Sequence, residues 1–367
     1  MANISCLIIA DNSDRFRKVS YYQCWLHEFQ THPELAATVL DLDALSHGSN
    51  IYKTLFSLLA SSYDLLIIHQ SAMWHIETKL WRLLAPLIAR KHCLKVIFFV
   101  NEYRFLWKQL ASANQIKATH IASQFPQDVA EHLYKKSLFK GHILSMPNAV
   151  DNRLFNPQKT WKERTIDIGF RGDPYPIYLG HNDRERITSY FQKEAPLVGL
   201  KTDIVVSRDC RLNEIEWNAF LNSCRAIIGH EAGGSLIDTQ DITRNFFDYL
   251  HQQVPADAFK TFVERFEESG ISKHCISGHI AAPRHLEALA TKTVQILFPG
   301  RYNDLIQPNQ HYISLEKDFS NSDEVFEKLR DDDYCAKLTE RAHAHVMKNH
   351  LYRHRVDHLI RVLGGKA

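Results

Sequence analysis

The feature that most constrains the fold is a regular alternation of short apolar segments with amphipathic helical segments through the first 150 residues. Short, nearly continuous apolar strands separated by helices are typical of a parallel sheet that is covered on both faces. We predict strands over residues 4–10, 38–42, 64–69, 94–100, 120–124 and 142–146, with helical stretches such as 15–29 and 79–90 between them. The first half of the chain is therefore predicted to be a doubly wound α/β domain.

The alternation breaks over residues 147–157, which hold two prolines and three asparagines and show neither helical nor strand period. Such residues favour turns, so we place a domain boundary here. The alternation then restarts, with strands predicted over 166–171, 202–206 and 226–229 and helices over 184–194 and 214–222. A chain of 367 residues exceeds what one hydrophobic core usually supports. We therefore predict two doubly wound domains, 1–157 and 158–345, that face a cleft.

A motif at residues 283–300 combines a helix start with charged side chains. Pro283 suits the first helical position, and the unpaired backbone N–H groups of the first turn attract anions. Arg284 and Glu287 lie one turn apart, so the first can hold a phosphate and the second a sugar hydroxyl. Taken alone, the same pair also fits a solvated ion pair on a helix surface. A short buried strand follows, which ties this helix to a sheet.

Composition limits the kinds of molecule that the protein is expected to bind and the compartment in which it is expected to be found. The formal net charge of +2 does not favour nucleic-acid binding. The seven cysteines are scattered, odd in number and form no C-x-x-C pair, which suits a reducing compartment better than a disulfide framework or a zinc site. No apolar run approaches the length of a membrane span, roughly 20 residues, and the start of the chain lacks a basic stretch. We expect a cytoplasmic protein.

The linker 147–157 and the motif around Arg284 resemble glycosyltransferases of the GT-B fold, especially the family 4 type and the spore-coat glycosyltransferases. The resemblance implies transfer of a sugar, of the hexosyltransferase type, from a nucleotide-sugar donor to a glycan, lipid-linked or other hydroxyl acceptor, as in polysaccharide biosynthesis. It also implies a retaining mechanism without a metal ion or cofactor. By the same resemblance, the last helix, within 346–367, crosses back to the N-terminal domain.

The resemblance assigns the donor site residue by residue. Arg171 and Arg284 would bind the diphosphate, and Glu287 would bind the ribose. Family 4 enzymes usually carry a second glutamate eight residues earlier, where this chain has His279. We take Glu231 as the displaced partner, with the residues between Ser235 and Pro283 as a mostly helical insertion. The residues that would form a small-residue loop beside the donor sugar are Gly233, Gly234 and Ser235.

On the acceptor side, His69 and Glu102 follow predicted strands at the ends that face the cleft. If the enzyme inverts, either is the candidate base, because a polar group at such a position can take the acceptor proton. A strand-end polar residue also serves as a plain cap. The stretch 103–108 carries basic and aromatic residues that could contact a membrane, so a location at the inner face of the membrane stays open.

A histidine series near the C-terminal end, His350, His354 and His358, has the spacing of one helix face. The glutamate of an H-E-x-x-H zinc motif is missing and arginines lie nearby, so we read a solvated basic face and predict no metal site. Two alternatives remain beside transfer: a non-catalytic binding protein on the same fold, and a nucleotide-sugar epimerase.

Overall fold

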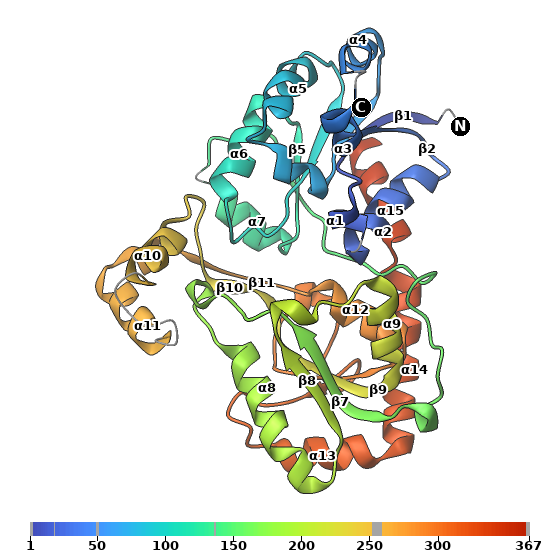
Figure 1. Ribbon diagram of the computed structural model, residues 1–367, viewed down its shortest axis with the longest axis vertical. Helices are drawn as coiled ribbons and strands as arrows, with labels where there is room; N and C mark the ends of the chain where they lie inside the picture. Colours follow the sequence, from blue (N-terminus) through green and yellow to red (C-terminus); the bar gives the residue numbers. More distant parts are fainter. Residues whose placement is uncertain (1–2, 18, 49–50, 136, 252–258, 365–367) are drawn as a thin grey trace.

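The structure is a computed structural model that describes residues 3–17, 19–48, 51–135, 137–251 and 259–364. It has two lobes, each built on a parallel sheet (Figure 1). The chain passes between the lobes through residues 147–157, which pair only by an isolated bridge from Val150 to Leu351. The predicted fold class, α/β with two doubly wound sheets, is confirmed.

The sheet of the N-terminal lobe has six parallel strands in the order β2-β1-β3-β4-β5-β6. The strands are β1 Ile4–Ala10, β2 Leu35–Asp41, β3 Leu65–Ile68, β4 Leu94–Phe98, β5 His120–Ser123 and β6 His142–Ser145. All four residues of β3 are buried, because helices cover both faces of the sheet. The six predicted strands are confirmed, with ends that differ by a few residues.

The helices of this lobe are α1 Asp14–Arg17, α2 Ser20–Thr31, α3 Leu42–His47, α4 Ile51–Ala60, α5 Lys79–Ala89, α6 Leu106–Gln115 and α7 Gln127–Tyr134. Helices α4 to α7 pack on one face of the sheet, and α2 packs on the other. The single helix predicted over 15–29 is wrong: the chain forms α1 and α2 instead. Val19 has an extended backbone that separates them and turns Ser20 toward the C-terminal lobe.

The sheet of the C-terminal lobe has five parallel strands in the order β13-β12-β9-β7-β8. They are β7 Ile166–Gly172, β8 Thr202–Val206, β9 Cys224–Gly229, β12 Val294–Leu297 and β13 Ile313–Ser314. The helices of this lobe are α8 Asp183–Glu194, α9 Glu214–Ser223, α12 Pro283–Ala290, α13 Ser322–Arg330 and α14 Asp332–Asn349. The motif helix is thus confirmed as α12, which starts at Pro283 and leads into β12.

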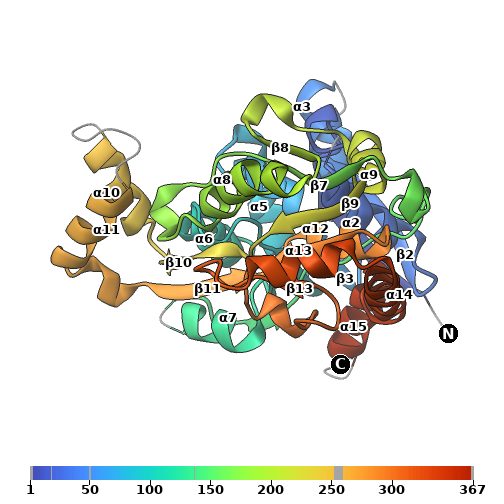
Figure 2. The ribbon, with the colours of Figure 1, turned by 90° about the horizontal axis from the view of Figure 1, so that it is seen from below.

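Between β9 and α12 the chain makes an excursion that contains strands β10 Ala232–Ile237 and β11 Ile276–Ile280 and helices α10 Ile242–His251 and α11 Phe259–Glu268. The two strands are antiparallel, and α10 and α11 project from the side of the molecule (Figure 1, Figure 2). Ile237 and Ile280 pack into the hydrophobic core of the N-terminal lobe. The insertion is mostly helical, as predicted, and its strands also join the two lobes.

The last helix, α15 Tyr352–Gly364, returns to the N-terminal lobe, as the resemblance implied. It packs on the sheet face that α2 covers, where the rings of Tyr352 and Trp25 lie 5.0 Å apart. Because the chain crosses between the lobes at 147–157 and again before α15, two connections hold the lobes together. No helix in the described part of the chain is long and apolar enough to cross a membrane.

Candidate functional site

Two arginines converge at the carboxyl end of β7. Arg284 lies in the first turn of α12, and its Nη1 donates to the carbonyl oxygen of Arg171 at 2.9 Å. Arg184 lies in the first turn of α8, and its Nη1 donates to the carbonyl oxygen of Asp173 at 2.6 Å. The two guanidinium groups lie 5.4 and 5.7 Å from the ring of Phe170. Both are therefore anchored by backbone oxygens and an aromatic ring.

The carboxylates of Glu287 and Asp173 attract Arg284 electrostatically, but neither pairs with it directly. Neither guanidinium forms a salt bridge with any described carboxylate. Burial, followed by repulsion from Arg184, lowers the pKa of Arg284 to about 10, and burial also lowers the pKa of Arg184. Two half-buried cations held by neutral groups favour an anion between or beside them. The arrangement is suited to binding a phosphate.

Glu287 lies one turn after Arg284 and is 4% exposed. Its Oε1 accepts a hydrogen bond from Ser20 Oγ of the N-terminal lobe at 2.8 Å, and its Oε2 accepts one from Trp217 Nε1 at 2.8 Å. Burial raises the pKa of Glu287, although these hydrogen bonds oppose the rise. The carboxylate thus sits at the junction of the lobes, beside the arginine pair, with a hydroxyl as one of its two partners.

Arg171 lies on β7, but its guanidinium is engaged elsewhere. Its Nη2 donates to Asp203 Oδ2 at 2.6 Å, its Nη1 donates to the carbonyl oxygen of Asp203, and it lies 4.3 Å from the ring of Phe220. The structure therefore brings Arg284 together with Arg184 rather than with the side chain of Arg171.

Sequence reasoning missed Arg184, although a signal was present. The helix dipole disfavours a positive charge in the first turn of a helix. An arginine at that position therefore suggests a role other than stabilising the helix. Arg184 is the second residue of α8, and it follows the strand whose carboxyl end forms the site.

Glu231 follows β9 as predicted, but it supports a loop of its own lobe. Its Oε1 accepts a hydrogen bond from the backbone N–H of Tyr302 at 2.6 Å, and Gly300 leaves no room for a side chain beside Oε2. Burial raises the pKa of Glu231, and the backbone N–H groups of Tyr302 and Arg301 lower it in part.

The small-residue loop predicted after Glu231 is instead strand β10, which holds Gly233, Gly234 and Ser235. A Cβ at Gly233, whose φ is +92°, would meet the carbonyl oxygen of Gly278 at 2.1 Å. Glycine is required there because β11 approaches so closely, not because a phosphate does. The sequence pattern concealed this pairing, since the partner strand lies more than 40 residues away.

The two predicted acceptor-side residues are buried in the N-terminal lobe. Glu102 is 2% exposed and accepts hydrogen bonds from Ser123 Oγ, the Gln124 N–H and Tyr134 Oη, and burial raises its pKa. His69 is 1% exposed, and burial lowers its pKa to about 3. Its Nδ1 accepts from the Ser71 N–H at 3.2 Å. Both side chains brace the ends of strands.

A different pair lies at the carboxyl ends of β1 and β3. Asp11 Oδ2 is 2.6 Å from Nε2 of His75, which ends the 3₁₀ helix η1 Gln70–His75. Burial favours the neutral carboxyl group, but hydrogen bonds from His75 and Ser13 lower the pKa of Asp11 overall. This aspartate–histidine pair was not recognised in the sequence. The signal was Asp11, which directly follows the buried strand β1.

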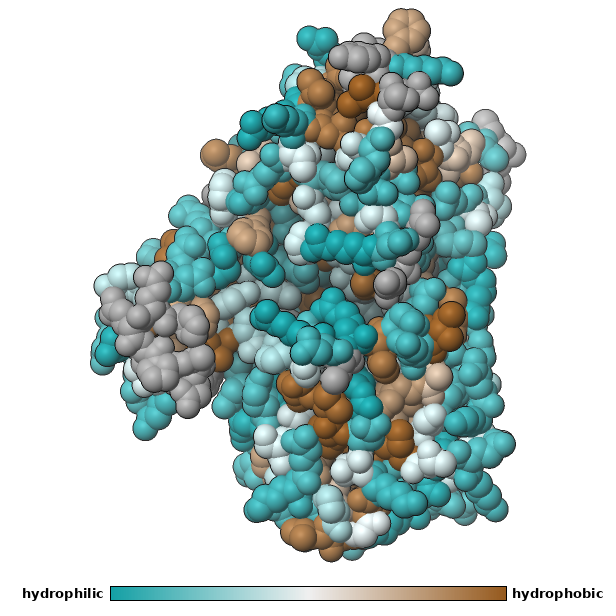
Figure 3. Space-filling view, viewed as in Figure 1, coloured by the Kyte–Doolittle hydropathy of each residue, from teal (hydrophilic) through white to brown (hydrophobic). Residues whose placement is uncertain are grey.

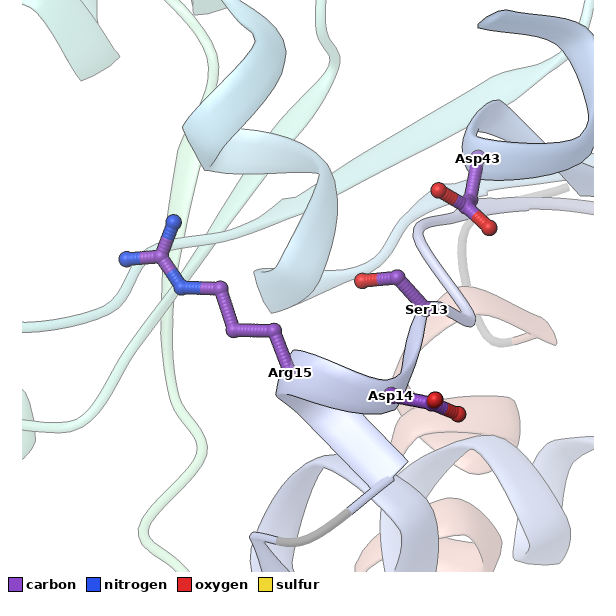
Figure 4. Close-up of a pocket in the computed structure, with 4 residues that line it drawn as sticks. All are labelled: Ser13, Asp14, Arg15 and Asp43. Carbon is purple, nitrogen blue, oxygen red and sulfur yellow. The ribbon is translucent and has the colours of Figure 1, made fainter. Parts of the chain in front are cut away.

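A hollow of about 370 Å³ opens beside this pair and is lined by Ser13, Asp14, Arg15 and Asp43. Asp43 points toward the segment that carries Ser13, whereas Arg15 extends away from both (Figure 4). The Arg15 guanidinium lies 4.1 Å from the ring of Trp74. The hollow thus combines hydroxyl, carboxylate and guanidinium groups, a set suited to a polar ligand with hydroxyl groups.

The C-terminal histidines contact one another and the backbone. His350 Nε2 lies 3.0 Å from His345 Nε2, and the rings of His345 and His311 are stacked at 4.2 Å. His354 Nδ1 accepts from the Leu351 N–H, and His358 is exposed. Within the described ranges, no group of three or more His, Cys, Asp or Glu residues is arranged to hold a metal ion.

Comparisons with known proteins bear on the fold. Residues 251–361 match the model of a family described as glycosyl transferase-like. No curated protein matches the chain by sequence.

Several solved structures share the architecture. Sucrose-phosphate synthase from Thermosynechococcus elongatus aligns over 100% of both chains, with a TM-score of 0.50 and 11% identity. HepE from Anabaena, solved with UDP, aligns over 100% of both chains, with a TM-score of 0.52 and 8% identity. An α-glucosyltransferase solved with UDP and a 13-mer DNA covers 99% of this chain and 100% of its own, with a TM-score of 0.55 and 9% identity.

These matches confirm the resemblance to GT-B glycosyltransferases, and the chain has the GT-B fold. The narrower likeness to spore-coat enzymes stays a prediction. The family match covers α12, with Arg284 and Glu287, and most of α15. The structural matches show the fold, and the family match shows a likeness to glycosyl transferase-like proteins over residues 251–361.

Proposed function

We propose that this protein is a glycosyltransferase that moves a sugar from a nucleoside-diphosphate donor to a hydroxyl group of its acceptor. The observation that carries the proposal is the pair Arg184 and Arg284, which lack a carboxylate partner in the described structure and lie beside Glu287. A diphosphate needs paired cations and a ribose needs a hydrogen-bond acceptor, so the arrangement fits a nucleotide. UDP in two structures of the same fold makes uracil the first base to test.

In the proposed donor complex, Arg184 and Arg284 bind the diphosphate and stabilise the charge that develops when the sugar departs. Gly172 lies beside this site: a Cβ there would meet the Phe170 ring at 3.1 Å and Arg284 Nη1 at 3.4 Å. Arg171 contributes its carbonyl oxygen, which positions Arg284. With this charge supplied by protein, transfer needs no metal ion, and we propose a metal-independent enzyme.

We propose that Glu287 accepts hydrogen bonds from the ribose hydroxyl groups. In the structure, Ser20 Oγ occupies one carboxylate oxygen at 2.8 Å, which is the place and chemistry of a sugar hydroxyl. A bound ribose would replace Ser20, so donor binding changes a contact between the two lobes. Glu231, with its loop at residues 300–302, would shape the donor-sugar end of the site.

We propose a retaining reaction. The bond between the anomeric carbon and the phosphate oxygen breaks, the acceptor oxygen bonds to that carbon on the same face, and the acceptor proton passes to the departing phosphate oxygen. This route needs no strong base from the protein. Both residues predicted as bases, Glu102 and His69, are buried and hydrogen-bonded, which supports it.

One observation favours an inverting reaction instead: Asp11 and His75 form a hydrogen-bonded pair at the strand ends of the acceptor lobe. The carboxylate can orient the imidazole, and the imidazole can take the acceptor proton. The acceptor, a glycan, a lipid-linked glycan or another hydroxyl compound, would then bind in the hollow beside Ser13 and Asp43. The anomeric configuration of the product, read by proton NMR, decides between the two reactions.

The proposal is tested first by binding and then by turnover. Thermal shift with UDP, GDP and dTDP should show stabilisation by at least one nucleotide, and Arg284→Ala should abolish it. Arg186→Ala, an exposed arginine on the same helix as Arg184, is the matched control and should bind as the native chain does. A chain that ignores all three nucleotides would overturn the proposal. Hydrolysis of the corresponding nucleotide sugar without acceptor then separates an enzyme from a binding protein.

A further inference from the structure

Helices α4, α5 and α6 form a surface that the donor site does not use. They lie on one face of the N-terminal sheet, and α5 contacts both α4 and α6 (Figure 1). Their outward residues include Phe56, Leu83 and Trp107, with side chains 73%, 55% and 47% exposed. Exposed apolar residues are common singly, but three large ones on adjoining helices call for an explanation. We call this the α4–α6 surface.

The segment that contains these three helices, residues 51–117, is strongly basic. Residues 51–117 contain nine Lys or Arg and three Asp or Glu, in a chain whose total net charge is +2, so the rest of the chain is net negative. None of the three helices contains an acidic residue. The cations that they carry are Lys53, Lys79, Arg82 and Lys108.

The three acidic residues of the segment do not cancel this charge. Glu102 is buried under the sheet edge, and Asp64 accepts from the Ser5 N–H at the opposite end of β3. Glu77 does reach the surface and pairs with Lys108 at 2.6 Å, with side chains 65% and 21% exposed. Lys53, Lys79 and Arg82 form no salt bridge with any described residue. The surface therefore keeps a positive charge around its apolar side chains.

We propose that the α4–α6 surface docks on an anionic lipid membrane. Lysine and arginine attract the headgroups of acidic lipids, while Phe, Leu and Trp enter the boundary between headgroups and acyl chains. The long stems of the cations can lie along the apolar residues with their charges outward. Hydrophobic and hydrophilic residues lie side by side across the upper part of the molecule in the space-filling view (Figure 3).

A nucleic acid would also be attracted by the positive charge. It would not explain why the apolar side chains of Leu83 and Phe56 are exposed among the cations. The membrane accounts for both features. Docking there would place an enzyme of this fold beside lipid-borne acceptors, but the surface and its test do not depend on the donor site.

The test measures sedimentation of the full chain with vesicles of phosphatidylcholine and with vesicles in which about a quarter of the lipid is phosphatidylglycerol. We expect binding to the anionic vesicles only, weakened by salt. Lys79→Ala with Arg82→Ala should lower the partition coefficient about tenfold, and Leu83→Ser with Trp107→Ser should lower it by about the same factor. The matched controls are Leu197→Ser and Lys193→Ala on the C-terminal lobe, which should leave it unchanged.

Circular dichroism and thermal unfolding show whether each variant is folded. Equal sedimentation with neutral and anionic vesicles, or an equal loss in the control variants, would overturn the proposal. So would tighter binding to a DNA duplex than to the anionic vesicles, with Leu83→Ser and Trp107→Ser binding DNA as the native chain does, because the surface would then be a nucleic-acid site.

Discussion

The two lobes share one architecture, but their charged residues have different kinds of partner. In the N-terminal lobe, Glu102 accepts three hydrogen bonds and Asp11 pairs with His75. In the C-terminal lobe, Arg184 and Arg284 contact backbone oxygens and rings but no described carboxylate. A buried polar group whose partners all lie in the protein stabilises the fold, whereas a buried charge without its counter-charge calls for a ligand. We infer from this contrast that the C-terminal lobe is the one that takes an anion.

The largest effect that we expect comes from removing the carboxylate of Glu102. Glu102→Ala leaves the Tyr134 hydroxyl, Ser123 hydroxyl and Gln124 N–H without their acceptor, and should lower the free energy of unfolding by about 3 kcal/mol. Chemical denaturation measures the change. UDP affinity of the folded variant should equal that of the native chain. If Glu102→Ala were as stable as the native chain but inactive, Glu102 would be a catalytic residue.

On the ligand-binding side, Glu287→Ala should weaken UDP binding about tenfold, because the ribose loses a charged acceptor. Isothermal titration calorimetry measures it. Glu216→Ala, an acidic residue of α9 whose carboxylate caps its own helix, is the control and should keep native affinity. An unchanged affinity in Glu287→Ala would remove Glu287 from the nucleotide site.

The pH dependence of the free energy of unfolding is a second test of the role of Glu102. Burial raises the pKa of Glu102, so the native state binds a proton more readily than the unfolded chain does. Its contribution to stability is greatest below the unfolded pKa and falls as pH rises through the folded value. As pH rises from about 4.5 to 7, the free energy of unfolding of the native chain should fall relative to that of Glu102→Gln. Parallel stability curves for the two proteins would contradict this assignment.

The smallest expected effect concerns the contact between the lobes. Ser20→Ala frees one oxygen of Glu287, so UDP should bind about threefold more tightly. Ser20→Thr, which keeps the hydroxyl, is the matched control. Weaker binding in Ser20→Ala would mean that Ser20 positions the carboxylate for the nucleotide rather than competing with it.

Much of the fold followed from local patterns. The apolar strands of both sheets, the turn-rich linker and helix α12 were predictable, because each is encoded by neighbouring residues. The pairing of β10 with β11 was not, since Gly233 meets Gly278 across an insertion of two helices. The break at Val19 was missed for a related reason, because Ser20 turns toward a residue of the other lobe.

The candidate site divides in the same way. Arg284 and Glu287 stand together in one helix, so their spacing alone suggested a nucleotide site. Arg184 joins them from another helix, and only the folded chain shows that Arg171 points to Asp203 instead. A strand-end residue such as Glu102 can face a ligand or the core. Its hydrogen-bond partners, which come from β5 and α7, determine which of the two it faces.

The central claim is that Arg184 and Arg284 form a diphosphate site. The most direct measurement compares the affinities of UDP and uridine for the native chain and for the double variant Arg184→Ala with Arg284→Ala. The native chain should prefer UDP by a factor of about 100 or more, and the double variant should bind both ligands with similar, weak affinity. A double variant that keeps the full preference for UDP would contradict the account.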